Sequence, residues 1–320
     1  MSANGRCVAL ICGELSGDRL GAGLAEQLAG LQPGIRMVGV GGERMRQAGV
    51  ESWMDCTIFS VMGYWDALKC LPRLLAGRSR LRRQLLAQRP DVYVGIDAPD
   101  LNLALGSEFR AQGGKYVQYV CPSFWAWRPE RAKTLASGCD LVLALLPFER
   151  QICQERGIAA EFVGHPAADQ LQPPEDRARL RQQLGFDGQK KLLALLPGSR
   201  EQELTAHLPI FAAAAGIVAE DFAGLQVCCA VPDFLLDQAR SMWQRLTAAR
   251  AVFVGGKAHE LLAAADAALC KSGTVTLEAA LLDCPQAVAY RLAPAAHWLA
   301  RQRMKGKDPA ADAMTKQVLG

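Results

Sequence analysis

Two carboxylates stand directly after a run that predicts a buried strand. In "VGIDAPDLN" (94–102), Asp97 ends the predicted strand of residues 90–97, and Asp100 follows three residues later. A carboxylate at a strand end can take a proton from an attacking hydroxyl group, which typically contributes ~10²–10⁴ in rate. Either carboxylate could instead cap the next helix, which Pro99 helps to begin. We expect Asp97 to be catalytic and Asp100 to be structural.

Two further strand ends carry residue types that suit an anion. "LALLPGSREQEL" (193–204) and "KSGTVTLEAALL" (271–282) each end a strand with small residues and begin a helix. Free amides at a helix start bind phosphate, and a carboxylate farther along can accept both ribose hydroxyls. Each loop alone could be a capped turn, but together they predict a nucleotide-diphosphate site. Its expected residues are Ser199, Arg200, Ser272, Gly273, Thr274 and Glu278.

The first strand end is glycine-rich. "CGELSGDRLGAG" (12–23) contains neither G-x-G-x-x-G nor the P-loop G-K-[ST]. Glu14 and Asp18 make a phosphate cradle less attractive and suit sugar hydroxyls better. Ser16 or Asp18 could alternatively cap the following helix.

Aromatic and cationic residues alternate in "CPSFWAWRPER" (121–131), after another strand. Aromatic faces beside fixed cations suit an amphipathic ligand that carries sugar, acyl chain and phosphate. The alternative places Trp125 in the core and the arginines in solvent. His165, in "FVGHPAAD", is equally consistent with a ligand contact and with a hydrogen-bonded residue at a domain junction. The expected acceptor-side residues are Glu14, Ser16, Asp18, Trp127, Arg128 and His165.

A long basic and apolar stretch, "YWDALKCLPRLLAGRSRLRRQLLAQRP" (64–90), has no acidic residue between Asp66 and Asp91. Cations interleaved with leucines favour an anionic membrane surface. An ordinary surface helix is the alternative, and nucleic acid is not expected as a partner. The expected membrane residues are Leu68, Lys69, Leu71, Arg73, Leu74, Leu75 and Arg78.

These residues need a scaffold that brings strand ends together. Runs that predict strands occupy 7–12, 35–40, 90–97, 115–120, 140–145 and 161–164, then 191–199, 225–231, 249–255, 267–270 and 285–290. Helical patterns between them predict parallel sheets covered on both faces. The segment 172–177 is a linker candidate, so we expect two doubly wound, Rossmann-like α/β domains facing a cleft.

The composition is ordinary for a folded domain pair. Among 320 residues, 50% are hydrophobic and 21% charged, and the net charge is only +4, so an anionic partner needs a local patch. Eleven cysteines without a C-x-x-C pair predict buried free thiols in a reducing compartment, and no metal site is expected. We expect no cleaved signal peptide and no membrane-spanning helix.

The set of motifs resembles the lipid-A-disaccharide synthase family. "GELSGDRLGAGL", "VGIDAPDLN", "PSFWAWRPER", "LPFE", "FVGHP", "LALLPGSR" and "SGTVTLEAALLDCPQAVAYR" occur in the order found in that family, from about residue 7 to about residue 303. The resemblance implies a GT-B fold with an acceptor and lipid-side domain (1–169), a UDP-sugar-binding domain (170–294) and a shortened C-terminal tail (295–320).

The resemblance also implies an activity. It is an inverting, metal-independent glycosyl transfer that needs no cofactor and joins UDP-2,3-diacylglucosamine to lipid X, a diacylglucosamine 1-phosphate. The products are the β-1,6 lipid A disaccharide 1-phosphate and UDP. The protein would be cytoplasmic, would bind peripherally to the Gram-negative inner membrane and could assemble as a homodimer. By position, Asp97 matches the base for the acceptor hydroxyl, and Arg200 lies near the diphosphate.

The chain departs from the family pattern at two places. It stops at "DPAADAMTKQVLG" without the Leu-Pro-Asn motif that follows in other members, and Lys271 stands where a small residue is expected. Two alternatives therefore stay open: a truncated, non-catalytic paralogue that binds UDP-sugar or lipid, and another GT-B sugar-nucleotide enzyme such as an epimerase.

Overall fold

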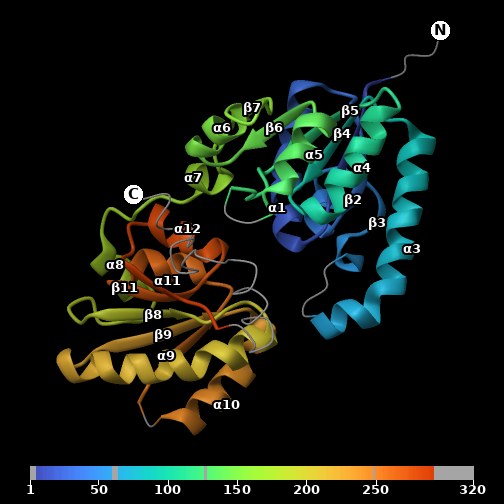
Figure 1. Ribbon diagram of the computed structural model, residues 1–320. Coiled ribbons are helices and arrows are strands. Elements are labelled where there is room, and N and C mark those ends of the chain that lie inside the picture. The colour runs from blue at the N-terminus through green and yellow to red at the C-terminus, as the bar shows by residue number, and fades with distance from the viewer. Residues whose placement is uncertain (1–4, 60–63, 126–127, 248, 292–320) are drawn as a thin grey trace. The chain divides into compact units, whose positions relative to one another are not determined.

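The computed structural model describes residues 5–59, 64–125, 128–247 and 249–291, with the backbone alone at 64–70 (Figure 1). The chain forms two compact units, Met1–Pro166 and Ala167–Gly320. Each unit is built on one parallel sheet.

The first unit contains a seven-stranded sheet in the order β3-β2-β1-β4-β5-β6-β7. All of its neighbouring strands are parallel. The strands are β1 (Cys7–Cys12), β2 (Arg36–Gly41), β3 (Glu51–Asp55), β4 (Val92–Ile96), β5 (Lys115–Tyr119), β6 (Leu141–Ala144) and β7 (Ala160–Phe162). The chain runs outward from β1 to β3 and then returns to the other side of β1 with β4. The carboxyl ends of β1 and β4 therefore form a topological switch point, where such sheets bind ligands.

The second unit repeats this plan with five parallel strands in the order β10-β9-β8-β11-β12. They are β8 (Leu192–Leu196), β9 (Gln226–Val231), β10 (Val252–Gly255), β11 (Ala267–Lys271) and β12 (Gln286–Ala289). Here the chain moves from β8 to β10 and returns beside β8 with β11, so β8 and β11 form the switch point. Leu196 and Cys270 are paired at its carboxyl end.

Helices connect the strands within each unit. In the first unit they are α1 (Leu15–Leu31), α2 (Glu43–Gln47), the 3₁₀ turn η1 (Cys56–Ile58), α3 (Tyr64–Gln88), α4 (Pro99–Ala111), α5 (Glu130–Gly138) and α6 (Pro147–Gln154). The short helix α7 (Pro166–Gln170) begins at the last residue of that unit. The helices and the 3₁₀ turn of the second unit are α8 (Arg177–Gln183), α9 (Glu201–Asp221), η2 (Asp233–Leu235), α10 (Leu236–Leu246), α11 (Ala258–Ala264) and α12 (Thr274–Leu281).

The cores confirm the expectation of buried strands and buried thiols. Every residue of β8 is buried, and β1 is buried from Val8 to Cys12, as expected for parallel sheets with two covered faces. The ten described cysteines are all free, and only Cys7 among them is not fully buried. All the strand runs expected from the sequence occur, but β3 was missed because its sequence, "ESWMD", is not an apolar run.

A buried carboxylate begins α6. Glu149, 4% exposed, accepts a hydrogen bond from the amide of Leu146 at 3.0 Å. Burial raises the pKa of Glu149 to about 7, although hydrogen bonds from the amides of Leu146 and Leu145 oppose that rise. The native state therefore binds a proton that the unfolded chain releases near its ordinary pKa of 4.5.

This pKa predicts a pH dependence of stability. Because the folded pKa lies above the unfolded one, the free energy of unfolding should fall as pH rises from about 4.5 to about 7. Glu149→Gln keeps an oxygen for the amide of Leu146 and should flatten this slope in denaturant titrations at several pH values. An unchanged slope in Glu149→Gln would show that Glu149 does not cause it.

Candidate functional site

Asp97 lies in a strained turn at the carboxyl end of β4. Asp97 and Ala98 both have left-handed backbone conformations, with φ of 50° and 42°. Such conformations are costly for residues other than glycine and cluster at functional sites. The turn directs the chain from β4 into α4, which begins at Pro99. Gly13, after β1, packs closely on this turn, since a Cβ atom there would lie 2.8 Å from that of Ala98.

Two buried amide side chains hold this turn in place. The carbonyl oxygen of Asp97 accepts hydrogen bonds from Asn102 Nδ2 at 2.9 Å and from Gln118 Nε2 at 3.1 Å. The amide oxygen of Asn102 accepts from the Tyr93 hydroxyl at 2.6 Å, and that of Gln118 accepts from the Tyr116 hydroxyl. These hydroxyls fix each amide with its NH₂ group toward the strand ends. Asn102 and Gln118 were not expected as positioning residues. The sequence feature that could have identified them is a single amide side chain within or beside an apolar run.

The surroundings of Asp97 favour a proton acceptor. Burial raises the pKa of its carboxyl group, and the negative charge of Glu14 raises it further. A hydrogen bond from the backbone of Ala98 and the charge of Arg131 act in the opposite direction but do not cancel the rise. A carboxylate with a raised pKa is a stronger base, which suits removal of a proton from a hydroxyl group.

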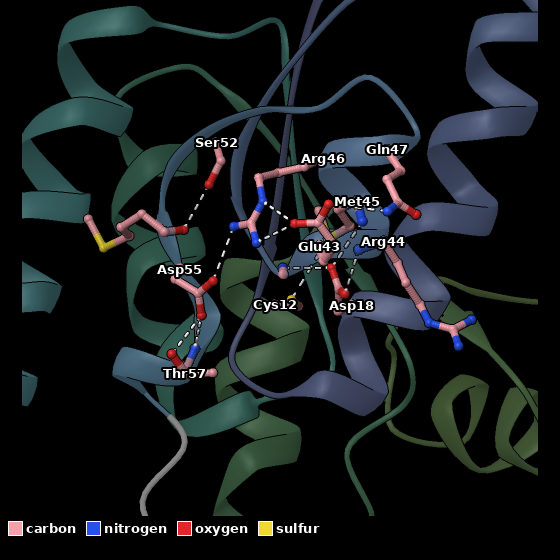
Figure 2. Close-up of polar contacts among 12 residues, drawn as sticks. Cys12, Asp18, Glu43, Arg44, Met45, Arg46, Gln47, Ser52, Asp55 and Thr57 are labelled. Atoms are coloured by element: carbon pink, nitrogen blue, oxygen red, sulfur yellow. Dashed lines mark hydrogen bonds and ion pairs between the residues drawn. The ribbon is translucent and has the colours of Figure 1, made fainter. Parts of the chain in front are cut away.

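The other residues expected in the loop after β1 have different roles. Glu14 and Ser16 are exposed at the start of α1, and Glu14 is close enough for its charge to act on Asp97. Asp18, in contrast, is 2% exposed and points toward α2 (Figure 2). Its carboxylate accepts from the amides of Gly42 at 2.6 Å, Arg44 at 3.1 Å and Met45 at 3.1 Å. We therefore correct our expectation for Asp18, because its oxygens are occupied by the backbone that begins α2.

The aromatic and basic stretch lies at the carboxyl end of β5. The ring of Trp125 packs edge to face on Phe148, with centroids 5.4 Å apart, beside the core. Asp100 accepts hydrogen bonds from Arg128 Nη1 and Arg131 Nη2, each at 2.6 Å. Arg131 is buried and Arg128 is half-buried, so this pair presents fixed cations near the Asp97 turn. Trp127 lies outside the described residues.

His165 lies away from this cluster. It follows β7, which is the edge strand of the first sheet, three strands from β4. At a strand spacing of about 4.8 Å, this places the two strand ends roughly 14 Å apart. The strand order alone does not place His165 beside Asp97, and its expected ligand contact stays a prediction.

In the second unit, the two expected anion loops adjoin each other at the switch point. One contains Ser199 and Arg200 after β8, and Arg200 is the N-cap residue of α9. The other contains Ser272, Gly273 and Thr274, and Gly273 is the N-cap residue of α12. Gly273 and Thr274 are exposed, so amides at this helix start are open to a ligand.

Glu278 lies on α12, one turn beyond Thr274. It is 9% exposed, and its Oε1 lies 3.0 Å from Nε2 of His259, the second residue of α11. His259 could not be predicted from the sequence, because a lone histidine in a helical pattern carries no motif. The pair fixes the carboxylate that is expected to face the ribose.

The expected membrane segment corresponds to the long helix α3, which runs along the outside of the first unit (Figure 1). Its C-terminal half packs into the core through Leu81 and Leu85. Farther toward its N-terminus, Leu71 and Leu75 are 47% and 57% exposed, beside exposed Arg73 and Arg78 and half-buried Leu74. The side chains of Leu68 and Lys69 lie outside the described residues. No helix in the described part of the chain could cross a bilayer.

Solved structures of similar fold are sugar-nucleotide enzymes. A UDP-GlcNAc 2-epimerase from Neisseria meningitidis bound to UDP-GlcNAc gives a TM-score of 0.60 at 11% identity, covering 92% of this chain and 85% of that one. A UDP-N-acetylglucosamine 2-epimerase described as putative, from Listeria monocytogenes, gives 0.57 at 14% identity, covering 92% and 82%. These similarities concern the fold alone. They confirm two parallel sheets with flanking helices in a GT-B-like arrangement.

Sequence relatives are closer. The lipid-A-disaccharide synthase of Azotobacter vinelandii is 43% identical over 93% of this chain and 79% of its own length. That of Xanthomonas axonopodis pv. citri is 43% identical over 90% of this chain and 66% of its own length. The chain thus spans about two thirds to four fifths of the length of these relatives. The family model for lipid-A-disaccharide synthetase matches residues 8–307, and the chain therefore belongs to the lipid-A-disaccharide synthase family, a family of glycosyltransferases.

Proposed function

We propose that this protein transfers diacylglucosamine from UDP-2,3-diacylglucosamine to the 6-hydroxyl group of lipid X. The products are the β-1,6 lipid A disaccharide 1-phosphate and UDP. The observation that carries this proposal is the Asp97 turn: a carboxylate with a raised pKa at the switch point of the first sheet. The family of the chain supports lipid A disaccharide synthesis in general, and the substrates named here belong to the proposal.

On the acceptor side, Asp97 takes the proton of the 6-hydroxyl group of lipid X. The oxygen of that hydroxyl group attacks the anomeric carbon of the donor. Attack on the face opposite the leaving UDP inverts the configuration at that carbon, which requires the reacting groups to be held in line. Arg128 and Arg131, which hold Asp100, supply fixed cations for the phosphate of the acceptor.

On the donor side, the loops after β8 and β11 receive the nucleotide. The exposed amides at the start of α12 and the guanidinium group of Arg200 offset the negative charge that develops on departing UDP. Glu278, held by His259, accepts the ribose hydroxyls. The bound UDP-GlcNAc of the Neisseria meningitidis neighbour shows that a protein of this fold binds a nucleotide of the same class.

The test is an assay of the purified chain with UDP-2,3-diacylglucosamine and lipid X. We expect UDP and the tetraacyl disaccharide in equal amounts, identified by mass spectrometry. UDP binding without turnover would instead support a non-catalytic binding protein. Conversion of UDP-GlcNAc to its 2-epimer without the lipid would support an epimerase. Either result would refute the proposed transfer.

We also propose that α3 contacts the cytoplasmic face of the inner membrane. The exposed leucines Leu71 and Leu75 can enter the acyl boundary while Arg73 and Arg78 meet anionic headgroups. The double substitution Leu71→Glu and Leu75→Glu should weaken binding to phosphatidylglycerol vesicles by about tenfold or more, since burial of both side chains is lost.

Vesicle co-sedimentation measures this effect. Leu31→Glu is a matched control, because Leu31 is 83% exposed and ends α1, so it is not part of α3. We expect the control to bind vesicles as the unaltered protein does. Equal binding by the α3 double variant would exclude α3 as the membrane contact.

A further inference from the structure

A buried ion pair connects the two loops at the switch point of the second sheet. Lys271 Nζ lies 3.0 Å from Oε1 of Glu203, and the two side chains are 16% and 10% exposed. Lys271 is the last residue of β11, and Glu203 lies in the first turn of α9. The pair therefore joins the start of the β11–α12 loop to the helix that follows the β8–α9 loop.

Both members of the pair also touch the backbone of these loops. Glu203 Oε2 accepts a hydrogen bond from the amide of Ser199 at 3.0 Å and lies 2.6 Å from the position of a Cβ atom at Gly198. The ammonium group of Lys271 lies 3.6 Å from the equivalent position at Gly273. It also lies 5.3 Å from the ring centroid of Tyr290, at a distance that favours a cation–π contact. The pair is thus enclosed between the loops.

Glu203 creates an electrostatic problem for any anion bound there. An uncompensated carboxylate would repel a diphosphate, and like charges at short range cost several kcal/mol. Burial opposes the charged form of Glu203, but its pKa is lowered overall because Lys271, the amide of Ser199 and Arg200 outweigh burial. Glu203 is therefore ionised at neutral pH, and its charge has to be balanced.

Arg200 is the second cation near Glu203. Its Nη1 lies 3.4 Å from the same Oε1 atom that Lys271 approaches to 3.0 Å. Without Lys271, the strongest attraction for this buried carboxylate would come from Arg200. This contact is longer than that of Lys271, and the Arg200 side chain is 41% exposed, so Arg200 alone neutralises Glu203 less completely.

We propose that Lys271 is a positioning residue for the donor diphosphate: it neutralises Glu203 and holds the two loops together. This inference rests on the proposed function, because it assumes a nucleotide diphosphate at these loops. Lys271 acts here through Glu203 and not as a direct ligand.

The experiment is a set of UDP dissociation constants measured by isothermal titration calorimetry. Lys271→Met should weaken UDP binding about tenfold or more, because the negative charge of Glu203, no longer neutralised by Lys271, opposes the ligand. The double variant Lys271→Met with Glu203→Gln removes both charges, and the glutamine oxygen can still accept from Ser199. Its affinity should return to within about threefold of the unaltered protein, since a neutral pair can replace a buried ion pair without loss.

Lys191→Met is the matched control. Lys191 Nζ lies 3.4 Å from Asp266 Oδ1, and these two residues stand directly before β8 and β11, at the strand ends opposite to the two loops. Its lysine is 61% exposed, so the control should bind UDP as the unaltered protein does. Circular dichroism spectra test whether each variant used in the UDP titrations is folded.

The results separate this inference from the proposed function. If the unaltered protein does not bind UDP, both are overturned. If it binds UDP and Lys271→Met binds equally well, the inference fails while the proposed function stands. If Lys271→Met binds weakly and the double variant does not recover, Lys271 is a direct phosphate ligand and the positioning role is refuted. Should Lys271→Met not fold, weak UDP binding by the double variant would equally refute the role, and near-normal binding would support it.

Discussion

Asp97→Asn is expected to lower the rate of disaccharide formation by about 10²–10⁴-fold, the usual contribution of a general base. Asparagine is the informative replacement because it tolerates the left-handed backbone that this turn requires, with φ of 50°. It also keeps the size of the side chain, so loss of the proton acceptor is the main change. The measurement is UDP release from saturating UDP-2,3-diacylglucosamine and lipid X.

Asp91→Asn provides the control at the opposite end of β4. Asp91 Oδ2 accepts a hydrogen bond from the amide of Cys7 at 2.7 Å, and its replacement should leave turnover within about twofold, as for a surface substitution. A second readout is the pH profile of kcat/KM. It should decline at acidic pH through a pKa above the ordinary 3.8 of aspartate, because Asp97 must be ionised to act. Full activity of Asp97→Asn would remove Asp97 from the mechanism.

Asp18→Ala should destabilise the first unit by about 3 kcal/mol or more. The substitution leaves the amides of Gly42, Arg44 and Met45 without their acceptor, and each buried amide left unpaired costs about 1–3 kcal/mol. The free energy of unfolding, measured by urea titration, reports this loss. UDP binding by the folded protein should be preserved, since the loops proposed to bind UDP belong to the second unit.

Asp55→Ala is the comparison for this prediction. Asp55, the half-buried N-cap residue of η1, accepts from the amide of Thr57 at 2.9 Å and pairs with Arg46 of α2 at 3.1 Å, and Figure 2 shows both carboxylates. Water can replace Asp55, so its loss should cost only about 1 kcal/mol. If Asp18→Ala were as stable as the unaltered protein but bound lipid X poorly, Asp18 would return to the acceptor site.

The sequence predicted the sheets well because buried parallel strands are nearly continuous apolar runs. The run "LLALL" in β8 is such a strand, and every one of its residues is buried. The edge strand β3 escaped prediction for the opposite reason. Its ends, Glu51 and Asp55, are charged, and it pairs with β2 alone, so it needs no continuous apolar sequence.

The position of a site residue could be predicted where that residue follows a strand. Its hydrogen-bond or ion-pair partner could not be predicted where the partner is distant in sequence. The position of Asp97 after β4 could be predicted, but the contact of its carbonyl oxygen with Gln118 depends on the pairing of β4 with β5. Asp18 was misinterpreted because its amide partners lie on α2, more than twenty residues farther along the chain. The pairing of Lys271 with Glu203 likewise follows only from the adjacency of β8 and β11.

The hydroxyl groups of Tyr93 and Tyr116 have a consequence for how this protein can evolve. Each hydroxyl holds the amide of Asn102 or Gln118 that supports the Asp97 turn. Phenylalanine would fill the same volume at either position, yet it would leave the buried amide oxygen of Asn102 or Gln118 without its donor. The proposed role of Asp97 therefore places a constraint within the hydrophobic interior, where two aromatic side chains are required for a polar atom as well as for their bulk.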